Sequence, residues 1–372
     1  MAAVSGHGKR IAPVLACGLV LAAGGCDLGG GSSGRESRSV SRGGTIRGAG
    51  ATLAVPLHRR WAQAFRQREG TDVRYEPIGL SRGVSEFTAA LIDFATIEAP
   101  LNDIEIRTAA ADKSRPVHIP VAVGAVALAY RVHGAGDNLR LDGSTLAAIF
   151  LGRVTRWNAP AIRRLNPGRA LPPTPIEVVH RADSTGTTLL FTSYLARASA
   201  EWSRRLGADD AVAWPVGRPA ASNAAAVDAV ARTDGAIGYI DAGSARTAGL
   251  SRAVLLNPAG RFVAPAPATI AAAARLVGGV PSDLRFLSVA SSPEPAAYPM
   301  TSAIFTLVYR DPCQVKIQPD NARRLSRWLR FVLGPAGQRL AGTTRGFGPL
   351  APDVAARARA ATRRLTCDGK RL

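Results

Sequence analysis

One polar stretch, His180 to Leu190, combines the residue types that hold a small anion. It follows a short apolar run at 176–179 that is typical of a strand, and apolar residues at helical spacing come after it. Hydroxyl side chains, a glycine and the free N–H groups of a helix N-terminus therefore gather at one turn, with Arg181 four residues before Thr185. The stretch contains no paired nucleophile and base. We expect it to bind an oxyanion without reacting with it.

Two further polar segments follow predicted strands nearer the N-terminus. Thr52 and Leu53 stand at the start of a predicted helix, and Leu80 and Ser81 stand at the start of the next one. A third strand ends at Glu98. Alternating strands and helices predict a parallel sheet, whose ligand sites lie at the carboxyl ends of the strands. These segments are therefore candidates for contacts with the same ligand.

The composition is that of a folded protein with a large core. The chain has 372 residues, of which 47% are hydrophobic, and this length predicts two domains or one large one. The formal net charge of +20 comes mostly from arginines that are scattered along the chain. A nucleic-acid-binding surface would have clustered basic residues interleaved with aromatic ones, and the sequence has neither pattern. We therefore expect no nucleic-acid partner.

The N-terminal residues 1–26 predict an export signal. A basic start precedes an apolar run at 11–23, which is too short to span a membrane, and small residues lead to Cys26. Cys26 stands where a bacterial lipoprotein is cleaved and lipidated, although Ala23 occupies a position usually held by leucine. Ordinary signal cleavage is the alternative. A diacyl anchor would hold the protein at the outer face of the cell membrane, and the Gly- and Ser-rich residues 27–44 would form a flexible tether.

Two cysteines of the exported body remain, Cys313 and Cys367. An oxidising compartment permits a disulfide between them, and two buried free thiols are the alternative. Their wide separation and the lack of a Cys-x-x-Cys pattern argue against a zinc site. We expect neither a metal nor a cofactor.

Taken in order, the motifs of the chain resemble those of the phosphate-binding proteins of bacterial phosphate ABC transporters. The similarity extends from Ile46 to about Ala361. It is carried by Gly48-Ala-Gly-Ala-Thr52 with Trp61, Tyr75-Glu-Pro-Ile-Gly79, Asp93-Phe94 with Ala99-Pro100, Ile119-Pro-Val, Leu165-Asn-Pro-Gly168-Arg-Ala-Leu-Pro172, Arg181-Ala-Asp183 with Gly186-Thr187-Thr188, Phe191-Thr-Ser-Tyr-Leu195, Gly238-Tyr239 and Tyr298-Pro299.

The resemblance implies an α/β fold of the periplasmic-binding-protein type II class. In this fold two domains, each a mostly parallel sheet flanked by helices, enclose the ligand in a cleft, and the chain crosses between them twice. The crossings would be the apolar runs near Ala125 and near Tyr239. The expected limits are 45–125 and 243–372 for the first domain and 126–242 for the second.

The resemblance also implies a set of phosphate ligands, with Asp183 holding the guanidinium of Arg181 in place. A buried carboxylate would favour hydrogen phosphate, which has a proton to donate, over sulfate, which has none. The sequence departs from the family pattern at Leu80, Glu98 and Thr185, where serine, aspartate and serine are usual. The implied ligands are Thr52, Leu53, Leu80, Ser81, Glu98, Arg181, Thr185, Gly186 and Thr187.

The function implied is capture of inorganic phosphate by a monomeric, lipid-anchored receptor that delivers it to an ABC permease. Two alternatives remain open. The first is a divergent relative that binds another oxyanion or acts as a surface phosphate sensor. The second, a secreted phosphate-ester hydrolase, would need a metal cluster or an activated nucleophile. The histidines have no metal-ligand spacing, and we expect His58 on a helix surface and His180 at a strand end. We therefore expect no enzyme activity.

Overall fold

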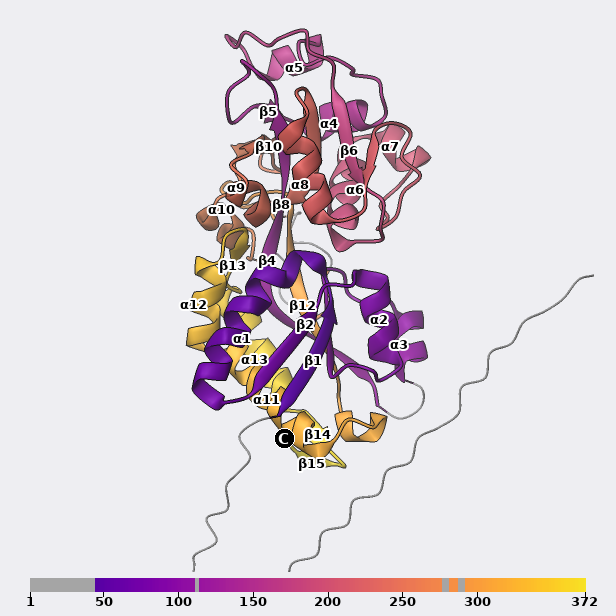
Figure 1. Cartoon of the computed structure of the whole chain (residues 1–372), viewed down its shortest axis with the longest axis vertical. Coiled ribbons are helices and arrows are strands. Elements are labelled where there is room, and N and C mark those ends of the chain that lie inside the picture. Colours follow the sequence, from indigo (N-terminus) through magenta and orange to yellow (C-terminus); the bar gives the residue numbers. More distant parts are fainter. Residues whose placement is uncertain (1–43, 111–113, 276–280, 287–291) are drawn as a thin grey trace, which may run out of the picture. The chain divides into compact units, whose positions relative to one another are not determined.

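The computed structural model describes most of the chain downstream of the predicted tether (Figure 1). The predicted export signal, the predicted lipidation site Cys26 and nearly all of the predicted tether lie outside the described residues. No helix within the described part is both long and apolar enough to cross a membrane. The described residues are 44–110, 114–275, 281–286 and 292–372.

One long strand, β4 (Pro116–Arg131), joins two parts of a single sheet. Its residues 116–125 pair antiparallel with β12 (Thr301–Tyr309), and its residues 126–131 pair antiparallel with β8 (Ala236–Asp241). We call the part on the 116–125 side lobe 1 and the part on the 126–131 side lobe 2. The apolar run from Ile119 to Tyr130 in the sequence predicts a buried strand pair or a crossing segment here. The structure has one continuous strand, buried along nearly its whole length because both lobes pack on it.

Lobe 1 is built on three parallel strands in the order β2-β1-β3, followed by β12 and β4. Helices α1, α11 and α13 pack on one side of these strands, and α2 and α3 pack on the other (Figure 1). The lobe contains β1 (Thr45–Gly50), the 3-10 helix η1 (Thr52–Ala54), α1 (Val55–Glu69), β2 (Asp72–Glu76), α2 (Leu80–Thr88), β3 (Phe94–Ile97), α3 (Asp103–Ala110), α10 (Pro267–Ala272), β12, the 3-10 helix η3 (Pro312–Val315), α11 (Pro319–Val332), α12 (Pro335–Thr343), β13 (Phe347–Gly348), α13 (Pro352–Thr362), β14 (Thr366–Cys367) and β15 (Lys370–Arg371).

Lobe 2 continues the sheet in the order β4-β8-β6-β7, with β6 parallel to both of its neighbours. Helix α8 packs on β6, β7 and β8, and α6 packs on β8 and β4. The lobe contains β5 (Arg140–Leu141), α4 (Gly143–Phe150), α5 (Pro160–Leu165), β6 (Glu177–Arg181), α6 (Gly186–Ala198), α7 (Ala200–Arg205), β7 (Arg218–Ala220), α8 (Asn223–Arg232), β8, α9 (Ala242–Thr247), β9 (Ser251–Arg252), β10 (Val254–Leu256) and β11 (Phe262–Val263).

Strand pairing extends lobe 2 beyond Asp241. Strand β9 pairs with Ala129 and Tyr130 of β4, and β10 pairs with β5 and β11. Helix α10, which follows, packs on β13 and β4 in lobe 1. The domain limits predicted from the sequence stay predictions, and these contacts favour an end of the second domain near Val263.

The apolar faces of the helices α1 and α11 form part of the core of lobe 1. Trp61 and Phe65 of α1 meet Trp328 of α11 edge to face, with ring centroids 6.2 and 5.2 Å apart, and all three side chains are buried. Gly70 then ends α1 in the left-handed conformation, at a φ of 67°. In the sequence, Val84, Phe87 and Leu91 recur at helical spacing, which predicts a helix that reaches Leu91. The helix ends at Thr88 instead, Ala90 has a φ of 54°, and Leu91 is 57% exposed.

The last residues are tied to lobe 1 through a disulfide between Cys313 and Cys367, with Cα atoms 5.0 Å apart. Asp311 accepts hydrogen bonds from Thr366 and from the backbone of Asp368 and Gly369, which holds the hairpin of β14 and β15 beside η3. The disulfide cysteines and Asp368 form a group that could hold a metal ion, but thiols joined in a disulfide are not available as thiolate ligands.

Candidate functional site

Residues from the two lobes meet where β3 ends and α6 begins. Glu98 follows β3 in lobe 1, and Gly186 is the first residue of α6 in lobe 2. A Cβ atom placed on Gly186 would lie 2.5 Å from Cβ and 2.6 Å from Oε2 of Glu98. Only a residue without a side chain permits this approach. The structure therefore brings two residues of the predicted ligand set into direct contact.

Three polar atoms of the predicted ligand set are buried without a hydrogen-bond partner among the described residues. They are Oε2 of Glu98, Nη1 of Arg181 and Oγ1 of Thr187. The three residues are 6%, 2% and 1% exposed. Burying a polar atom without a partner costs about 1–3 kcal/mol, and more for a charged group. A guanidinium N–H, a hydroxyl and a carboxyl oxygen are together suited to an oxyanion that carries a proton.

The guanidinium of Arg181 is held by a two-point interaction with Asp183. Nε donates to Oδ1 at 2.8 Å, and Nη2 donates to Oδ2 at 2.6 Å. The backbone N–H of Arg181 donates to the hydroxyl of Tyr239 at 2.9 Å. Because Asp183 occupies one edge of the planar fork, the other nitrogen, Nη1, is the atom left for a ligand.

Helix α6 presents its N-terminus at the same place. Thr185 is the N-cap, and its hydroxyl accepts from the backbone N–H of Thr188 at 3.0 Å. The same hydroxyl donates to Oγ1 of Thr188 at 3.1 Å, so its single proton is already used. The first N–H groups of a helix have no partner within it and carry the positive end of its dipole. Of the two threonines predicted as ligands here, Thr187 has the hydroxyl that is unpaired.

The predicted ligands of lobe 1 other than Glu98 lie at helix starts. Thr52 opens η1 and is half-buried, and Leu53 beside it is buried in the core. Leu80 opens α2, and its side chain packs into the lobe 1 core. These two leucines can therefore offer only backbone N–H groups. Ser81 is exposed, and its hydroxyl lies 2.7 Å from the hydroxyl of Ser184 in lobe 2.

A stack of two rings, the buried His58 and the partly buried Tyr75, supports the turn before Thr52. Tyr75 donates to the carbonyl of Ala51 at 2.8 Å, and its ring stacks on His58 with centroids 3.9 Å apart. Nε2 of His58 lies 2.8 Å from Oγ1 of Thr96. The expectation that His58 lies on a helix surface was wrong, because it is 1% exposed. Burial lowers the pKa of His58 to about 3, so it is neutral and serves packing.

Sequence reasoning missed Ser184 and Asp210. The hydroxyl of Ser184 donates to Oδ2 of Asp210 at 2.6 Å, and the backbone N–H of Thr185 donates to the Asp210 carbonyl at 3.0 Å. Asp210 lies in a loop well beyond α6, and no motif pointed to it. Tyr239, which the resemblance gave only as part of a motif and of a crossing between domains, bonds to both Arg181 and Thr188.

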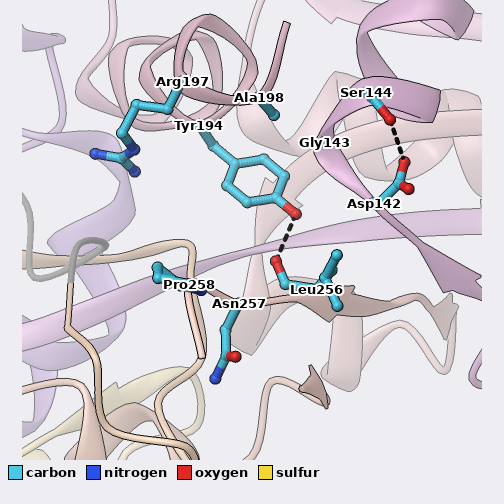
Figure 2. A pocket seen from close by; sticks show the side chains of 9 residues that line it. All are labelled: Asp142, Gly143, Ser144, Tyr194, Arg197, Ala198, Leu256, Asn257 and Pro258. Carbon is cyan, nitrogen blue, oxygen red and sulfur yellow. Dashed lines mark hydrogen bonds between the residues drawn. The ribbon is translucent and has the colours of Figure 1, made fainter. Parts of the chain in front are cut away.

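A separate hollow lies in lobe 2 and contains none of the predicted ligands (Figure 2). Its volume is about 390 Å³. Two of its polar side chains already have partners, since Asp142 caps α4 and the hydroxyl of Tyr194 donates to the carbonyl of Leu256 at 2.9 Å. None of the residues that line this hollow has a buried, unpaired polar atom like those of Glu98, Arg181 and Thr187.

Burial raises the pKa of the Glu98 carboxyl from an ordinary value of 4.5 to about 7. The nearby Arg181 opposes this shift, and Asp210 and Asp183 add to it. An exposed Glu98 would ionise from about pH 4.5, whereas the buried one keeps its proton up to about pH 7. The folded state with Glu98 buried is therefore most stable, relative to a state with Glu98 exposed, below pH 4.5. About 3 kcal/mol of this free-energy difference is lost as the pH rises to about 7.

We predict that a ¹³C NMR titration of the side-chain carboxyls will show one glutamate with a pKa near 7. The Glu98→Gln variant should lack this resonance and leave the others unchanged. A titration in which the signal lost in that variant has a pKa near 4.5 would show that Glu98 is hydrated rather than buried.

Comparisons with known proteins identify the family of the chain. The sequence profile of a family described as "PBP superfamily domain" matches residues 36–336. The chain is 34% identical over 277 residues to the phosphate-binding protein PstS of Xylella fastidiosa (strain 9a5c), covering 74% of each chain. It is 33% identical over 356 residues to the phosphate-binding protein PstS 3 of Mycobacterium leprae (strain TN), covering 91% of this chain and 93% of that one.

A solved structure shows the same fold. It is a putative phosphate ABC transporter substrate-binding protein from Clostridium perfringens with bound phosphate, 15% identical, with a TM-score of 0.57 over 83% of this chain and 100% of that chain. The predicted type II periplasmic-binding-protein fold is thereby confirmed. The chain belongs to the PBP superfamily and, within it, to the family of the phosphate-binding proteins PstS.

Proposed function

We propose that this chain is an extracytoplasmic solute-binding protein that captures inorganic phosphate and delivers it to an ABC permease. The observation that carries the proposal is the set of buried, unpaired atoms on Glu98, Arg181 and Thr187, which come from both lobes. Relatives that cover most of the chain are named phosphate-binding proteins, which supports the choice of anion.

Each of the three unpaired atoms would make a different hydrogen bond with phosphate. Nη1 of Arg181 gives a charge-assisted hydrogen bond, and Oγ1 of Thr187 and the N–H groups at the start of α6 donate to further oxygens. Oε2 of Glu98 accepts from a phosphate hydroxyl when the carboxyl is ionised and donates to a phosphate oxygen when it is protonated. With a pKa near 7, both forms exist at neutral pH. Sulfate has no proton, so only the protonated form of Glu98 suits it.

The finer parts of the proposal come from the sequence and the resemblance. Cys26 would carry the lipid anchor and keep the protein on the outer face of the cell membrane, and the protein would act as a monomer. It would hold phosphate without converting it. Thr52, Leu53 and Leu80 would add backbone donors from lobe 1.

We predict that isothermal titration calorimetry will give micromolar or tighter binding of inorganic phosphate, and much weaker binding of sulfate above pH 7. Arg181→Ala should weaken phosphate binding by about tenfold to a hundredfold, because a charge-assisted hydrogen bond contributes about 1.5–3 kcal/mol. Arg204, which is exposed in the same lobe, gives the matched control Arg204→Ala with unchanged affinity. No heat with phosphate, or equal affinity for sulfate at pH 8, would contradict the proposal.

We also predict that Gly186→Ala will weaken phosphate binding at least tenfold. The new methyl group would collide with Cβ of Glu98, so the carboxyl or the lobe must shift away from the anion. The control is Gly342→Ala in α12, where a Cβ would meet only Pro349, at 3.4 Å and beyond. Equal phosphate affinities for the two variants would show that the contact between Gly186 and Glu98 is not needed.

A further inference from the structure

A chain of hydrogen bonds joins the two lobes beside the anion site. Oγ of Ser81, in the first turn of α2, lies 2.7 Å from Oγ of Ser184 in lobe 2. Oγ of Ser184 in turn donates to Oδ2 of Asp210 at 2.6 Å. The turns that carry the serines lie close together, since a Cβ on Gly79 would be 3.6 Å from the carbonyl oxygen of Ser184.

The direction of these hydrogen bonds follows from counting protons. The hydroxyl of Ser184 donates its single proton to Oδ2 of Asp210. Because that proton is used, Oγ of Ser184 can only accept in its hydrogen bond with Ser81. The hydroxyl of Ser81 in lobe 1 is therefore the donor to Ser184 in lobe 2. The bond to a carboxylate also makes the oxygen of Ser184 a better acceptor.

In lobe 2, this series of hydrogen bonds ends at Asp210, which is bonded to the start of α6. The carbonyl of Asp210 accepts from the backbone N–H of Thr185, the N-cap of α6, at 3.0 Å. Next to it, Asp209 exchanges two hydrogen bonds with the hydroxyl of Thr192, at 2.8 and 3.0 Å. Ser184 is therefore connected, through the loop that contains Asp209 and Asp210, to both Thr192 of α6 and Thr185, its N-cap.

We propose that Ser81, Ser184 and Asp210 form a latch that holds the lobes together over the bound anion and slows its release. The inference rests on the proposed function. It assigns Ser81 the role of a positioning residue that acts through Ser184, in place of the direct phosphate contact expected from the sequence.

A latch of this kind affects release more than capture. The bond between Ser81 and Ser184 exists only when the lobes meet, so it contributes nothing to the encounter of phosphate with an open site. A single neutral hydrogen bond changes an equilibrium by about threefold to tenfold. That factor should fall almost entirely on the dissociation rate.

The test is stopped-flow measurement of inorganic phosphate association and dissociation with the full chain. Ser81→Ala should raise the dissociation rate about threefold to tenfold and leave the association rate within about twofold. Ser81→Thr, which keeps a hydroxyl, should restore slow dissociation. The matched control is Ser85→Ala, one turn further along α2 and also exposed, with both rates unchanged.

A double variant separates the latch from a direct contact. If Ser81 acts through Ser184, adding Ser81→Ala to Ser184→Ala should change the dissociation rate no further. A full additional effect of Ser81→Ala in that background would show a direct contact with phosphate and overturn the latch. So would an unchanged dissociation rate in Ser81→Ala when the unmodified chain binds phosphate. Absence of phosphate binding by the unmodified chain would overturn the proposed function, and the latch with it.

Discussion

The site depends on two buried groups, the guanidinium of Arg181 and the carboxyl of Glu98. Each has one polar atom without a hydrogen-bond partner among the described residues. Arg181 uses Nε and Nη2 for its hydrogen bonds to Asp183. The side chain of Glu98 packs against Gly186, and its Oε2 is unpaired. Such burial is unfavourable unless a ligand completes the hydrogen bonds. The rise in the pKa of Glu98 has the same cause, since burial disfavours its charged form. An oxyanion between the lobes would satisfy both groups.

The fold places these groups by means of one strand. Because β4 belongs to both lobes, the ends of β3 and β6 face each other across it, one in each lobe. Helix starts follow the strand ends, so backbone donors converge where the side chains do. The glycine that opens α6 lets the lobes approach. The predicted ligands Gly186 and Thr187 therefore lie on the helix whose N-cap, Thr185, is bonded to Asp210.

Sequence patterns located the local parts of this arrangement. Arg181, Asp183 and Thr187 belong to one strand, turn and helix start, whose form follows from short-range pattern. The burial of His58 could have been foreseen, since it stands three and seven residues before Trp61 and Phe65 on the same helix face.

The pairing across the lobes could not be predicted from local pattern. Ser81 and Ser184 are 103 residues apart, and their contact depends on how the two lobes are placed against each other. The end of α2 was missed because alanines, which favour helix, form the turn after Thr88.

The central claim is that the unpaired atoms of Glu98, Arg181 and Thr187 are phosphate ligands. A crystal structure of the full chain grown with inorganic phosphate tests this most directly. We expect one phosphate whose oxygens lie within hydrogen-bond distance of Oε2 of Glu98, Nη1 of Arg181 and Oγ1 of Thr187. A phosphate bound elsewhere, with these atoms paired to other protein groups, would contradict it.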